Sequence, residues 1–121
     1  MIQFPVHFGA AFNDEGWEPH PFVVGLQRKT LFSRDKDGSD VTVFLFRGGG
    51  GKIEDVPFHA HATADEYTYV FAGTGKFEIE GQGIFEIQPG SMMCVPRGMR
   101  HRALDNSETL LTMNIYSPAI E

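Results

Sequence analysis

Two histidines, His59 and His61, are separated by one residue, and this spacing could hold a metal ion. On an extended strand residues i and i+2 point to the same face, so the two imidazoles would project together. Glu66 lies five positions beyond His61, an odd step that would put it on the opposite face of one continuous strand. Segment 62–65 must therefore turn, which places the histidine pair and the carboxylate on adjacent strands.

A second stretch of the chain supplies a third histidine. It runs Gly90, five residues, Pro96-Arg97-Gly98, two residues and His101, with Asp105 four positions further on. Between the two stretches, residues 66–71 are dense in β-branched and aromatic side chains, which predicts a strand.

Together these residues resemble the two sequence motifs of the cupin family, small β-barrels in which two histidines, a glutamate and a later histidine bind one metal. Gly73, which ends the strand after Glu66, falls at the closing glycine of the first motif. That motif usually opens with glycine where this chain has Ile53, and the second usually closes with asparagine where it has Asp105, followed by Asn106. Neither position is a ligand. The resemblance implies one divalent transition metal (Fe, Mn, Ni, Co or Zn) bound by four ligands: His59, His61, Glu66 and His101.

The composition is that of a folded globular protein. A length of 121 residues and 41% hydrophobic residues indicate one cupin domain over residues 1–121, with an N-terminal arm over 1–21 and a barrel over 22–121. There are 16 acidic and 10 basic residues, giving a net charge of −6 without a basic cluster. Nucleic acid and anionic membranes are therefore not expected partners.

The expected compartment is the cytoplasm. Cys94 is the single cysteine, so no intrachain disulfide forms, and a reducing environment is the simpler interpretation. Residues 1–10 have neither the basic residues nor the apolar run of a secretory signal, and no apolar segment is long enough to span a bilayer.

The strand pattern predicts an all-β, antiparallel sandwich or barrel. The resemblance narrows this fold to a double-stranded β-helix, or jelly roll. A polar turn is expected over 33–40, and the 41–47 strand is apolar on both faces. The expected strands are 22–27, 41–47, 66–71, 76–80, 84–88, 92–95, one opening at His101, and 109–116.

The aromatic residues of the N-terminal arm need burial. We expect them to cover the outside of the barrel or a partner subunit; a lid over the site is the alternative. The resemblance also implies a homodimer. The aromatic residues concerned are Phe4, Phe8, Phe12 and Trp17.

The walls of a substrate pocket are expected to be apolar. On the last strand, the face carrying Leu111, Met113 and Ile115 is predicted to look into the barrel. Tyr67 and Tyr69 alternate away from Glu66 and are assigned to outer packing, Cys94 is interpreted as a buried small apolar residue, and His7 and His20 as structural or surface residues. The candidate substrate-binding residues are Phe44, Phe46, Arg47, Met113 and Ile115, with the arginine as a partner for a carboxylate.

Two kinds of function fit these residues. The first is an enzyme whose small-molecule substrate chelates the metal through neighbouring oxygens, as an enol, catechol, hydroxy acid or keto acid does. Dioxygenase-type oxidation is favoured, with non-oxidative isomerase, cyclase or lyase chemistry as the alternative, and Glu66 is the candidate catalytic residue because it could alternate between ligand and base. The second is a non-catalytic module that binds a sugar or acid through its metal.

Overall fold

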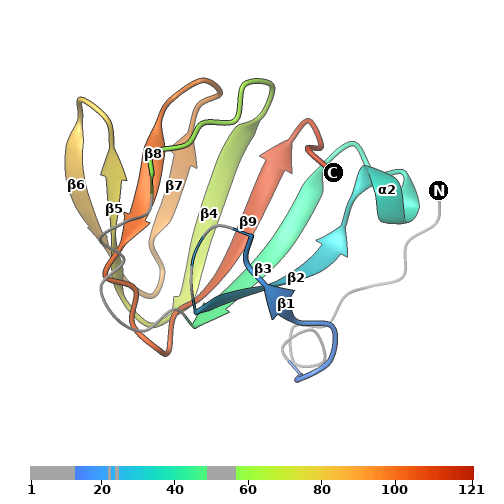
Figure 1. Ribbon diagram of the computed structural model, residues 1–121, viewed down its shortest axis with the longest axis horizontal. Coiled ribbons are helices and arrows are strands. Elements are labelled where there is room, and N and C mark those ends of the chain that lie inside the picture. Colours follow the sequence, from blue (N-terminus) through green and yellow to red (C-terminus); the bar gives the residue numbers. More distant parts are fainter. Residues whose placement is uncertain (1–12, 22, 24, 49–56) are drawn as a thin grey trace.

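A computed structural model describes residues 13–21, 23, 25–48 and 57–121 as two antiparallel sheets (Figure 1). The larger sheet has six strands in the order β1-β2-β3-β9-β4-β7, and the smaller has three in the order β6-β5-β8. The expectations for Phe4, Phe8, Phe12 and His7 lie outside the described residues. The elements are β1 (Glu18–Pro19), β2 (Leu26–Phe32), α2 (Arg34–Asp37), β3 (Thr42–Gly48), β4 (Asp65–Ala72), β5 (Gly75–Ile79), β6 (Gly83–Ile87), β7 (Met92–Val95), β8 (His101–Leu104) and β9 (Leu111–Ser117).

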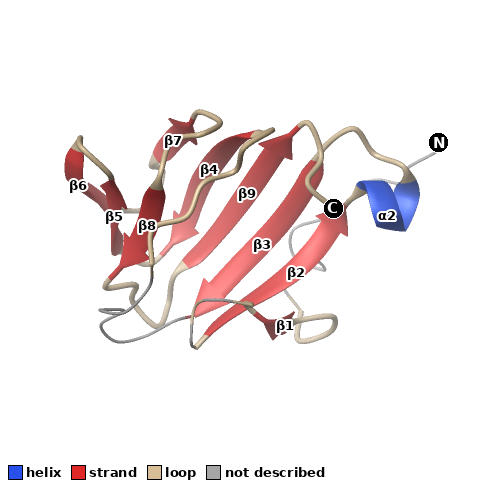
Figure 2. Cartoon of the chain, turned by 45° about the horizontal axis from the view of Figure 1, so that its top comes forward, coloured by secondary structure: helices blue, strands red, loops and turns tan. Residues whose placement is uncertain are grey.

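Strand β3 lies near the middle of the larger sheet and is buried on both faces, as its sequence predicts. Leu45 is 0% exposed and its neighbour Phe44, which points the other way, is 2% exposed. Figure 2 shows β3 between β2 and β9, so its backbone is paired on both sides. Its inner face belongs to a buried cluster of Val23, Leu26, Phe44, Phe46, Ala64 and Tyr116.

The predicted strand over 22–27 is wrong in its bounds, because β2 runs from Leu26 to Phe32. The polar residues of β2 lie between β1 and β3. Arg28 forms ion pairs with Glu18 of β1 and with Glu121 at the C-terminus, 3.1 and 3.3 Å away. Pairing with β1 and β3 therefore holds this polar segment in a strand.

The polar segment 33–40 contains one helical turn, α2, where a simple turn was expected. The Ser33 hydroxyl caps it by accepting the Lys36 backbone N–H at 2.9 Å, and Gly38 ends it with φ +72°.

No helix in the described part of the chain is long and apolar enough to cross a membrane.

The register between β4 and β9 fixes which residues face inward. Residues that are directly paired in a sheet share a face. Glu66 pairs with Tyr116, Thr68 with Asn114 and Val70 with Thr112. All six side chains are buried, so this row forms the inner surface of the larger sheet.

Candidate metal centre

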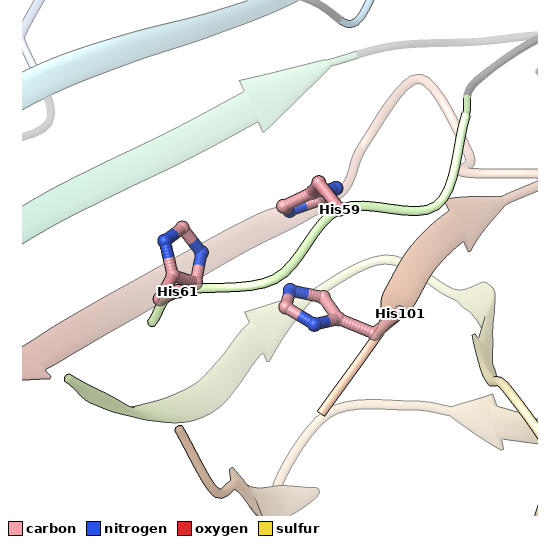
Figure 3. Close-up of side chains that lie close together, drawn as sticks. All are labelled: His59, His61 and His101. Carbon is pink, nitrogen blue, oxygen red and sulfur yellow. The ribbon is translucent and has the colours of Figure 1, made fainter. Parts of the chain in front are cut away.

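Three histidines converge at the place where the two sheets meet (Figure 3). His59 and His61 lie in the segment before β4, and His101 is the first residue of β8. The backbones of His59 and His101 exchange two hydrogen bonds of 2.9 and 2.8 Å, which fixes these segments side by side. One ring nitrogen from each histidine lies within 4.8 Å of the others, so the cluster is able to hold a metal ion.

Glu66 of β4 points into the same cluster. Its Oε1 lies 3.3 Å from Nε2 of His61 and 3.3 Å from Nε2 of His101. These three atoms are buried and, among the described residues, lack a hydrogen-bond partner. Buried polar atoms are normally paired, and ligands about 2.1 Å from one metal ion lie about 3 Å apart. The donor set therefore fits a divalent cation.

The ionisation of the cluster also suits a cation. Burial alone would raise the pKa of the Glu66 carboxyl, but the adjacent His101 and His61 and a hydrogen bond from Asn114 hold it well below its usual range. Burial, followed by the neighbouring imidazoles His101 and His61, lowers the pKa of His59 to about 4. At neutral pH the carboxylate is thus charged and His59 is neutral, as metal ligands must be.

A backbone carbonyl orients His101. Its Nδ1 lies 2.9 Å from the Met99 carbonyl oxygen, so Nδ1 carries the proton and donates it. In the neutral ring, the lone pair of Nε2 then faces the cluster. Metal-binding histidines are commonly oriented by such an outer hydrogen bond.

Asn114 orients Glu66 in the same way, and sequence reasoning missed it. Its Nδ2 donates to Glu66 Oε2 at 2.7 Å and to Thr68 Oγ1 at 2.9 Å. Its Oδ1 accepts a hydrogen bond of 2.7 Å from the Thr112 hydroxyl. The signal in the sequence was two polar residues, Thr112 and Asn114, on one face of an otherwise apolar strand.

Replacing Asn114 with aspartate should weaken metal binding about 10- to 100-fold, the usual effect of losing such an outer partner. The aspartate would turn an acceptor toward Glu66, where the wild-type amide donates. Dissociation constants for Zn²⁺ and Mn²⁺, measured by competition with a chelator, test this. Asn106→Asp is the matched control, because Asn106 is equally buried and lines the same cavity. Equal affinities in the two variants would contradict the assigned role.

A cavity of about 80 Å³ adjoins the cluster. Its wall on β9 is the Thr112, Asn114 and Tyr116 face. The prediction that Met113 and Ile115 look into the barrel is therefore wrong. The apolar character of Met113 and Ile115 favoured their face of β9 as the inner one. The polar face is inward instead, because its side chains form hydrogen bonds with one another and with Glu66. The remaining lining residues are His20, Val23, Leu26, Phe46, His59, Glu66, Thr68, Lys76, Phe77, Ile87, Met93, His101, Ala103, Asn106 and Leu110.

The other candidate pocket residues are divided between the cavity and its surroundings. Phe46 lines the cavity, whereas Phe44 packs behind it, 5.7 Å between ring centroids. Arg47 lies elsewhere: its guanidinium stacks on Trp17 at 4.2 Å and pairs with Asp14 at 3.2 Å.

The prediction that Cys94 is a buried residue is also wrong, because the structure leaves Cys94 exposed. Its strand, β7, is at the edge of the larger sheet.

His20, which the sequence analysis interpreted as a structural or surface residue, lines the cavity. Its Nδ1 accepts the Val23 backbone N–H at 3.1 Å, and its ring lies 5.3 Å from that of Phe46. Burial, and then the charge of Arg28, lower its pKa to about 4, so the ring is neutral at physiological pH. A lone histidine in an N-terminal arm gives no periodic signal from which this position could be predicted.

The fold and the site together define a small double-stranded β-helix with a histidine cluster able to hold a metal. Residues 46–116, more than half of the chain, match the family model described as a cupin domain. The chain belongs to the cupin family.

Solved structures agree with this fold. KdgF from Halomonas sp. is 24% identical, with 87% of each chain covered and a TM-score of 0.65. An RmlC-like cupin from Shewanella frigidimarina is 23% identical, with 90% of each chain covered and a TM-score of 0.65. Ectoine synthase from P. lautus is 17% identical, covering 96% of this chain and 78% of its own, with a TM-score of 0.70. No curated protein sequence matches this chain.

Proposed function

We propose that this cupin is an enzyme that uses one divalent metal to act on a small substrate with neighbouring oxygen atoms. The observation that carries the proposal is the convergence of three buried atoms that have no hydrogen-bond partner among the described residues: His61 Nε2, His101 Nε2 and Glu66 Oε1. His59 completes the ligand set. When bound there, a divalent cation would supply Lewis acidity to a coordinated substrate oxygen.

The cavity next to the cluster supports an enzyme over a purely structural metal site. A structural metal is normally closed in by protein ligands, whereas a catalytic one keeps room for another molecule. The space of about 80 Å³ is well below the usual size of a pocket for a drug-sized ligand. It favours a substrate of few atoms.

Dioxygenase-type oxidation is the first reaction to test. A non-oxidative isomerase, cyclase or lyase reaction is the second candidate, and Tyr116 favours it. Burial, and then the adjacent Glu66 carboxylate, raise the pKa of the Tyr116 phenol well above its usual value. This phenol lines the cavity and stays protonated, so it could donate a hydrogen bond to a substrate beside Glu66.

Metal analysis combined with oxygen uptake tests the proposal. Protein purified without added metal would be analysed for its metals and then assayed on catechols, enols, hydroxy acids and keto acids. We expect near-stoichiometric metal, and turnover that disappears in His101→Ala. Oxygen uptake identifies the oxidative reaction, and product formation without oxygen uptake identifies the second candidate. A protein that takes up no divalent metal would overturn the proposal.

A further inference from the structure

The hydrogen bonds around Asn114 have a fixed direction. Asn114 Nδ2 donates to Glu66 Oε2 at 2.7 Å, so Asn114 turns its NH₂ group toward this carboxylate. The Asn114 Oδ1 then faces Thr112, whose hydroxyl must donate. The second proton of the NH₂ group goes to the Thr68 oxygen. The Glu66 carboxylate thus fixes which groups donate and which accept in the hydrogen bonds of three neighbouring side chains.

This direction gives the two threonines opposite roles. Within the described part of the chain, Asn114 is the one hydrogen-bond partner of the Thr68 hydroxyl, which accepts and so keeps its own proton for another group. The Thr112 hydroxyl has used its proton on Asn114 and retains lone pairs. Both side chains line the cavity and are buried, 3% and 4% exposed. The same wall therefore offers one donor and one acceptor.

We propose that Thr68 and Thr112 form a subsite for a hydroxyl group of the substrate. Thr68 donates a hydrogen bond to that hydroxyl, and the hydroxyl donates to Thr112. A carbonyl or carboxylate could use only the first of these contacts. The inference rests on the proposed metal-dependent function and narrows its substrate to a short acid with a hydroxyl beyond the oxygens that chelate the metal.

The test compares acids that differ by one hydroxyl. Glycerate and lactate share a carboxylate and a 2-hydroxyl, and glycerate adds a 3-hydroxyl; 2,4-dihydroxybutyrate and 2-hydroxybutyrate form a longer pair. Binding of all four to the Zn²⁺-loaded protein would be measured by calorimetry. We expect the additional hydroxyl to strengthen binding about tenfold in at least one pair, the effect of a well-formed hydrogen bond.

Two variants assign this preference to the subsite. Thr68→Val keeps the side-chain shape and removes the hydroxyl, so the two acids of each pair should bind the variant with equal affinity. Thr68→Ser keeps the hydroxyl and should retain the preference. Zinc stoichiometry and thermal midpoints are measured in parallel.

The outcomes separate the two proposals. If the wild-type protein does not bind zinc, the proposed metal-dependent function itself is overturned. A zinc-loaded protein that binds neither acid of either pair, binds both members of each pair equally, or keeps its preference in Thr68→Val would overturn the hydroxyl subsite alone.

Discussion

Replacing His101 with glutamine is expected to weaken binding of divalent metals by at least about a hundredfold, more than the loss of an outer partner does. His101 is 2% exposed, and its Nε2 faces Glu66 at 3.3 Å. Glutamine keeps a polar side chain of similar length but does not place an imidazole lone pair in the cluster. Metal content after dialysis and the dissociation constant for Zn²⁺ measure the effect.

His20→Gln is the matched control for this substitution. His20 lines the same cavity but is not among the three histidines of the cluster. Its replacement should leave the metal affinity within about threefold of wild type, a difference below 1 kcal/mol. Similar losses in both variants would show that the cavity as a whole, rather than the proposed ligand set, controls metal binding.

The second large effect concerns folding. Gly73→Ala should lower the free energy of unfolding by about 3 kcal/mol or more. Gly73 has φ +79°, and a Cβ there would lie 2.4 Å from the backbone N and Cα of Leu110. Because these contacts are with backbone atoms, the turn after β4 would have to move away from the start of β9. Urea unfolding followed by circular dichroism provides the measurement.

Gly81→Ala separates the steric cost from the conformational one. Gly81 has almost the same backbone angle, φ +81°, but a Cβ there meets nothing within 4 Å. Its replacement should cost about 1–2 kcal/mol, the penalty of the left-handed conformation alone. If both variants lose the same stability, the close approach at Gly73 is not the reason for that glycine.

Local spacing was sufficient to predict that His59 and His61 project together. The resemblance to the cupin motifs added His101, and the structure brings all three histidines into one cluster. Strand β7, over Met92–Val95, was also predicted with the observed bounds, because turn signals enclose a short apolar run.

Features that depend on partners far along the chain were not predictable in this way. The inner face of β9 follows from its register with β4, in which Glu66 lies opposite Tyr116. The apolar residues favoured the opposite face, because the sequence pattern does not show that Thr112 and Asn114 form a hydrogen bond with each other. The role of Asn114 depends on a bond to a residue 48 positions away.

The proposed ligand set is divided between the two sheets of the molecule. Glu66 belongs to β4 in the larger sheet, and His101 belongs to β8 in the smaller one. A cation bound between them would link the larger sheet to the smaller one. Saturating metal would therefore add its binding free energy to that of folding, and the melting temperature would report on metal supply. Such a protein would be most open to unfolding, and to proteolysis, when its metal is scarce.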